Sequence, residues 1–174
     1  MTNTFGYIVI IFIILICAKP YLYFKMSDIN DLDKLLKTFK SKKRYKKEMD
    51  FQNDLYKYLK LKLKNKIEKP KGSKRQGTRD SDLLYKKIYP IETKINFSYT
   101  ISKSLRTQIP DYVNGRKHIH SNNLSLKEKL MLRFFDMQVF IVIAGIKNKN
   151  ALTDFKRDYP TGYGNRVHYY IVYE

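Results

Sequence analysis

Within the stretch SDLLYKKIYPIETKI, from Ser81 to Ile95, three side chains are of the types that bind a metal ion and handle a phosphate. Asp82 lies at the start of a short apolar run, and Glu92 and Lys94 lie two positions apart in the next run. Successive side chains of a strand alternate between its faces, so Glu92 and Lys94 share one face. If the two runs pair as a hairpin, Asp82 lies beside this pair at one edge of a sheet.

This arrangement contains the groups required for metal-assisted hydrolysis of a phosphodiester. Asp82 and Glu92 offer carboxylate oxygens to Mg²⁺ or Mn²⁺, and the backbone carbonyl of Thr93 offers a neutral oxygen. A bound cation lowers the pKa of a water and stabilises charge on a phosphate oxygen, while the Lys94 ammonium positions both. The structural alternatives are a cap at Asp82, with Asp80 as the ligand instead, and a solvated ion pair of Glu92 with Lys94.

The residues before this stretch predict helices and a loop. Residues 30–63 have a helical pattern that is interrupted near the lysine run at 42–47. In the second helix, Glu48 lies at the N-terminal end of a stripe formed with Gln52, Leu55 and Leu59. A first-turn acid favoured by the helix dipole is the alternative role for Glu48. Residues 68–80 include Pro and Gly but no apolar side chain, which predicts a loop.

The residues after this stretch complete an α/β pattern. A helix is expected from residue 98 until Pro110, followed by a short helix at 125–135 with a capping-box spacing. The apolar, β-branched run at 137–146 predicts a strand buried on both faces, and a loop then leads to a terminal strand from residue 167. The sequence therefore predicts a small mixed β-sheet flanked by helices.

The N-terminus carries an apolar run over residues 5–18 that continues to Phe24 across Lys19 and Pro20. Its length is just sufficient for a bilayer, and the basic residues follow it, so we expect a single-pass anchor with the C-terminal domain in the cytoplasm. Translation from Met26 would instead give a soluble intracellular protein. The expected domains are an anchor or hydrophobic leader at 1–25, a basic helical arm at 26–47 and an α/β domain at 48–174.

Positive charge is concentrated in one part of the chain. The 35 Lys and Arg exceed the 16 Asp and Glu by 19, and residues 34–75 hold 17 basic residues against 4 acids. Such a field favours a polyanion, either nucleic acid or an anionic membrane, although solvated helix faces of a lysine-rich protein are the alternative. The single cysteine, Cys17, excludes an intrachain disulfide and a cysteine zinc site. The expected nucleic-acid contacts are Lys42, Lys43, Arg44, Lys46 and Lys47.

The motifs RDSDLLY, YPIETKI and LRTQIPDY, with EMDFQNDLYKYL upstream and VFIVIAG downstream, resemble the PD-(D/E)xK phosphodiesterase superfamily of restriction-endonuclease-like nucleases. The resemblance covers about residues 45–146. It implies a core in the order helix, three strands, helix, strand. The implied site comprises metal ligands Asp82 and Glu92, an active-site Lys94, Glu48 on the first helix, and Gln108 after the motif.

Two residues depart from the family pattern. Ser81 stands where the nominal motif has proline, and Pro110 interrupts the predicted helix after Gln108. Hydrogen bonding to the backbone near Pro110 is the alternative role for Gln108.

These observations predict a metal-dependent nuclease acting on DNA, with Mg²⁺ or Mn²⁺ as cofactor. The alternatives are a non-catalytic basic protein that binds nucleic acid or an anionic membrane, and a small membrane-anchored structural protein. The catalytic prediction requires Asp82, Glu92 and Lys94 to come together.

Overall fold

The computed structural model describes residues 29–41, 44–70, 81–113, 138–160 and 166–173. The chain divides into two compact units, Met1–Thr38 and Phe39–Glu174. In the first unit, residues 29–38 form a helix with an ion pair of 2.6 Å between Asp33 and Lys37, one turn apart.

The apolar run predicted to span a membrane, residues 5–24, lies outside the described residues. No helix in the described parts of the chain has the length and apolar character needed to cross a bilayer.

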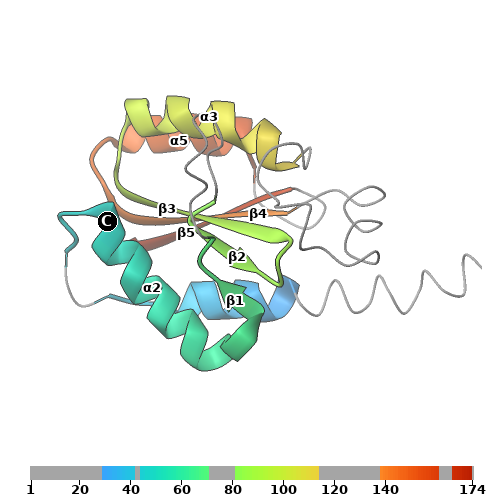
Figure 1. Ribbon diagram of the computed structural model, residues 1–174. Helices are drawn as coiled ribbons and strands as arrows, with labels where there is room; N and C mark the ends of the chain where they lie inside the picture. The colour runs from blue at the N-terminus through green and yellow to red at the C-terminus, as the bar shows by residue number, and fades with distance from the viewer. Residues whose placement is uncertain (1–28, 42–43, 71–80, 114–137, 161–165, 174) are drawn as a thin grey trace, which may run out of the picture. The chain divides into compact units, whose positions relative to one another are not determined.

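The second unit contains a mixed sheet of five strands in the order of the chain. The first three strands pair antiparallel, and the third, fourth and fifth pair parallel (Figure 1). The strands are β1 Ile67–Glu68, β2 Leu83–Tyr85, β3 Tyr89–Phe97, β4 Val139–Ile146 and β5 Val167–Tyr173. β4 is buried along nearly its whole length, as its uninterrupted apolar sequence predicts.

Helices cover both faces of this sheet. α3 (Tyr99–Val113) and α5 (Lys149–Asp158) lie side by side on one face, joined by an ion pair between Arg106 and Asp158. α2 (Glu48–Leu63) lies on the other face and continues into the short 3₁₀ helix Lys64–Lys66. The predicted fold class, an α/β fold with a mixed sheet flanked by helices, is confirmed.

Each helix is held by an apolar stripe. On α2 the buried residues recur every fourth position, at Phe51, Leu55, Leu59 and Leu63. Beneath α3 and α5 lies a core that combines residues of both helices with Val139, Ile141 and Ile143 of β4. These two apolar layers fix α2 and α3 on opposite sides of β3.

Two helix predictions were wrong. α3 does not end at Pro110 but continues to Val113, because an exposed proline in the last turn removes one backbone hydrogen bond without closing the helix. α5 lies where the sequence predicted a loop. It forms because the Asn148 side chain accepts a hydrogen bond from the backbone N–H of Ala151, capping the helix, while Ala151, Leu152 and Phe155 are buried. The helix predicted at 125–135 lies outside the described residues.

The sheet changes its pleat where β3 and β4 end. Asn96 has φ of 52° and Gly145 has φ of 84°, and the register places these two residues opposite each other. Strict alternation would put Phe97 on the face opposite Glu92, but Phe97 packs in the core beneath α3 and α5. β5 has a register shift at the same level, opposite Ile143 and Ala144. We call this feature the sheet kink.

Candidate active site

The predicted hairpin carries the acidic residues. β2 and β3 pair through Leu83 with Ile91, so the register extended by one residue places Asp82 opposite Glu92. In the connecting turn, Lys86 and Lys87 both have positive φ, a conformation that suits the right-handed twist of paired strands. Asp82, the residue before β2, therefore lies beside β3, where its carboxylate contacts Thr93 and comes within 3.8 Å of the Lys94 ammonium.

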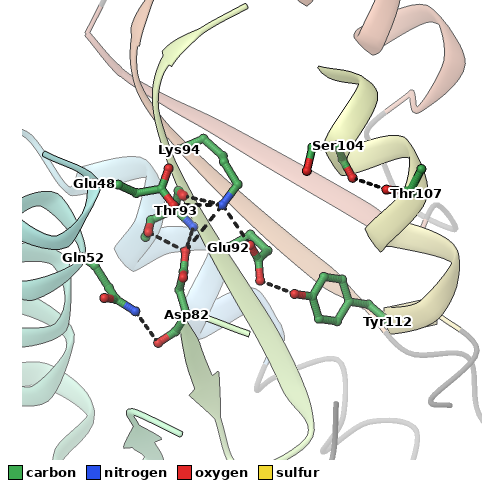
Figure 2. Close-up of polar contacts among 9 residues, drawn as sticks. All are labelled: Glu48, Gln52, Asp82, Glu92, Thr93, Lys94, Ser104, Thr107 and Tyr112. Carbon is green, nitrogen blue, oxygen red and sulfur yellow. Dashed lines mark hydrogen bonds and ion pairs between the residues drawn. The ribbon is translucent and has the colours of Figure 1, made fainter. Parts of the chain in front are cut away.

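Four oxygen atoms surround the ammonium of Lys94 (Figure 2). The Thr93 carbonyl oxygen lies 2.8 Å from Nζ, Glu92 Oε2 lies at 3.0 Å, Glu48 Oε1 at 3.2 Å and Asp82 Oδ2 at 3.8 Å. These oxygens come from α2, β3 and the residue before β2. We call this arrangement the oxygen cage.

Asp82 is held by β3 and α2. Its Oδ2 accepts hydrogen bonds from the Thr93 backbone N–H at 2.7 Å and from the Thr93 hydroxyl at 2.6 Å. The Gln52 amide donates to the Asp82 backbone carbonyl at 2.8 Å. Gln52 lies one turn after Glu48 on α2, so the same helix face supplies a cage oxygen and fixes the chain at the start of β2.

Glu92 is held from the opposite side by α3. The Tyr112 hydroxyl donates a hydrogen bond to Glu92 Oε1, and both residues are almost fully buried. The sequence pattern did not predict Tyr112 as a site residue. It lies one helical turn after the predicted Gln108 on α3.

Burial and charge act together on the ionisable groups of the cage. Burial, and next the negative charge of Asp82, raise the pKa of Glu92 to about 6. Burial also raises the pKa of Glu48. For Lys94, burial lowers the pKa, but the carboxylates of Glu92, Asp82 and Glu48 outweigh it and raise the pKa above its usual range. With its groups ionised, the cage carries three negative charges and one positive charge.

The other predicted residues are placed as follows. The Oε1 atom of Gln108 is buried and accepts no hydrogen bond from any described residue. Asp80, the alternative ligand, and the basic residues Lys42 and Lys43 lie outside the described residues. The remaining basic residues of the predicted nucleic-acid contact are exposed: Arg44, Lys46 and Lys47.

The donor set suits a hard divalent cation. Every cage atom is a carboxylate or carbonyl oxygen, the type that Mg²⁺ and Mn²⁺ bind. The ammonium holds these oxygens at 2.8 to 3.8 Å, whereas Mg²⁺ requires about 2.0 to 2.1 Å. In the described parts of the chain, no group of three or more His, Cys, Asp or Glu side chains is arranged to hold a metal ion. For Mg²⁺ to bind in place of the ammonium, these oxygens would have to move closer together.

Comparisons of this chain with protein-family models, with curated proteins and with solved structures found no match.

Proposed function

We propose that this protein is a metal-dependent phosphodiester hydrolase of the PD-(D/E)xK type that acts on DNA, with Mg²⁺ or Mn²⁺ as its cofactor. The observation that carries the proposal is the oxygen cage, in which Asp82, Glu92 and the Thr93 carbonyl meet on one cation, the Lys94 ammonium. With Glu48, three carboxylates surround this ammonium. Such a concentration of partly or fully buried charge is typical of functional sites.

The order of the elements supports the finer fold assignment. α2 precedes three antiparallel strands, β1 to β3, and α3 then leads to the parallel strand β4. This is the order of helix, three strands, helix and strand that the resemblance implies. Asp82 precedes the second strand and Glu92 lies within the third, as the motif requires.

The residues of the oxygen cage have different roles in the proposed reaction. Asp82, Glu92 and the Thr93 carbonyl would hold the cation, and Glu48, which also contacts the Lys94 ammonium, would orient a water beside it. The bound cation supplies Lewis-acid stabilisation of the phosphate and a more acidic water. Once displaced from the cage oxygens, the Lys94 ammonium would contact the scissile phosphate and balance the charge that develops on it.

A cleavage assay tests this proposal with the full-length protein, purified in detergent and incubated with plasmid DNA. We expect cleavage in Mg²⁺ and none in EDTA. Glu92→Gln keeps the size of the side chain but removes a ligand charge, so we expect the rate to fall at least about a hundredfold. Asp50→Asn is the matched control, because Asp50 is an exposed acid in the same first turn of α2 as Glu48.

The non-catalytic alternative makes the opposite prediction for this assay. A buried ion-pair network with Lys94 at its centre is also compatible with a protein that only binds nucleic acid. If Glu92→Gln retains its fold by circular dichroism and cleaves as fast as the parent protein, the cage is not an active site. A non-catalytic protein that binds nucleic acid would then be the better explanation.

A further inference from the structure

Tyr112, on α3, contacts the oxygen cage through Glu92. Its hydroxyl donates to Glu92 Oε1, while Glu92 Oε2 lies 3.0 Å from the Lys94 ammonium (Figure 2). The two oxygens of this carboxylate are thus bonded from opposite sides, by α3 and by β3. A carboxylate held at both oxygens has one orientation, and a hydrogen bond to a charged acceptor is about twice as strong as a neutral one.

The ring of Tyr112 has little freedom to move. It is 2 % exposed and belongs to the core beneath α3, together with Ile109 and Leu105, which precede it by one and two turns of the helix. The hydroxyl therefore reaches Glu92 from a fixed point. Glu92 itself is 3 % exposed, so water has little access to replace the missing partner if the hydroxyl is removed.

We propose that Tyr112 is a positioning residue that sets the orientation of Glu92, so that Oε2 faces the cation position now held by the Lys94 ammonium. This inference rests on the proposed function, and it assigns a role to a residue that the sequence pattern did not identify. Residues that orient a metal ligand through a hydrogen bond typically contribute 10-fold to 100-fold in metal affinity or activity.

The test uses Tyr112→Phe, which removes the hydroxyl and keeps the ring in the core. Mn²⁺ binding to the full-length protein without DNA is measured by titration calorimetry. We expect the variant to bind Mn²⁺ about tenfold more weakly. In the cleavage assay the half-saturating Mg²⁺ concentration should rise by a similar factor, while KM for DNA stays unchanged and saturating Mg²⁺ restores most of kcat.

Tyr159→Phe is the matched control. Tyr159 directly follows α5, packs on Phe155 and is partly buried against the same core, outside the oxygen cage. It should bind Mn²⁺ as the parent protein does. Tyr112→Met, which fills much of the same space without a hydroxyl, must shift the Mn²⁺ affinity in the same direction as Tyr112→Phe.

The outcomes separate this inference from the proposed function. If the parent protein binds Mn²⁺ and cleaves DNA but Tyr112→Phe has the parent affinity, the positioning role is overturned and the proposed function stands. If the parent protein neither binds Mn²⁺ nor cleaves, the proposed function fails and the positioning role fails with it. The positioning role is supported if both Tyr112 variants lose about tenfold in Mn²⁺ affinity and Tyr159→Phe loses none.

Discussion

At the level of single residues, the position of the Lys94 ammonium matters most. Its ammonium occupies the centre of the oxygen cage, within 3.2 Å of oxygens from Thr93, Glu92 and Glu48. The ammonium therefore neutralises part of the negative charge of the Glu48, Asp82 and Glu92 carboxylates. Under the proposed function, a metal cation would compete with this ammonium for the same oxygens.

We expect Lys94→Met to lower stability strongly in the absence of metal, because it leaves buried carboxylates without their partner. Breaking a buried pair in this way costs about 3 to 5 kcal/mol, which corresponds to a fall of roughly 10 °C in Tm for a domain of this size. Mn²⁺ should raise the Tm of Lys94→Met by more than it raises that of the parent, although DNA cleavage is lost.

Thermal unfolding with and without Mn²⁺ provides the measurement. Lys103→Met is the control, because Lys103 is an exposed lysine on α3 outside the cage. A smaller Mn²⁺-induced shift in Lys94→Met than in the parent would mean that the ammonium supports metal binding rather than opposing it.

The sequence predicted most of the site at this scale. Alternation along β3 places Glu92 and Lys94 together, and the hairpin brings Asp82 beside them, since both follow from local rules. Tyr112 was missed because its contact with Glu92 depends on how α3 docks on the sheet. An aromatic side chain in a helix is more often a core residue, and Tyr112 is that as well.

Elements with a strong local sequence pattern were predicted, whereas β1 and α5, which have a weak pattern, were not. α2, β3 and β4 each carry a periodic or continuous apolar pattern. β1 has two residues, too few for a period, and depends on pairing with β2. α5 buries only three apolar side chains in ten residues, so its helical signal was its Asn148 cap.

The sheet kink gives a prediction at the scale of elements. A Cβ added at Gly145 would lie 3.2 Å from the Tyr173 ring and 3.3 Å from Asn96 Oδ1, at a φ that L-residues rarely adopt. We expect Gly145→Ala to destabilise the protein by at least about 1 to 2 kcal/mol, measured by urea unfolding.

The matched change on the neighbouring strand should have the opposite sign. Asn96 also has a left-handed backbone, so Asn96→Gly relieves strain and should leave stability equal or slightly higher. If Gly145→Ala were as stable as the parent, the left-handed backbone at the kink would not be required by the fold.

At the scale of the whole molecule, a strongly basic chain contains a locally acidic site, the oxygen cage. The chain carries a formal charge of +19, whereas the cage holds more carboxylates than ammonium groups. If the protein acts on DNA as proposed, the basic residues would attract the phosphates, and the cage would repel them unless a cation were bound. DNA binding and cleavage should therefore be separable.

We expect neutral substitutions in the basic segment before α2 to weaken DNA binding for all sequences and to flatten its salt dependence. The slope of log K against log salt should fall by about 0.9 for each phosphate that the protein no longer neutralises. Fluorescence anisotropy at several salt concentrations measures this, with Glu92→Gln as the control that keeps low-salt binding. An unchanged slope would exclude this segment from the interface. The residues to change to Gln are Lys42, Lys43, Arg44, Lys46 and Lys47.

The hairpin between β2 and β3 also has a consequence for the order of folding. Asp82 and Glu92 are ten positions apart in the chain, whereas β3 and β4 pair parallel across a connection that includes α3. Closing a short loop costs less entropy, and hairpins form in about 1 to 10 μs, before most long-range parallel pairing. We therefore expect the two carboxylates to meet early in folding, with Lys94 on the same strand as their counter-ion. The Lys94 ammonium would then reduce the repulsion between the Asp82 and Glu92 carboxylates while the hairpin forms. This would happen before Tyr112 or β4 packs against the hairpin.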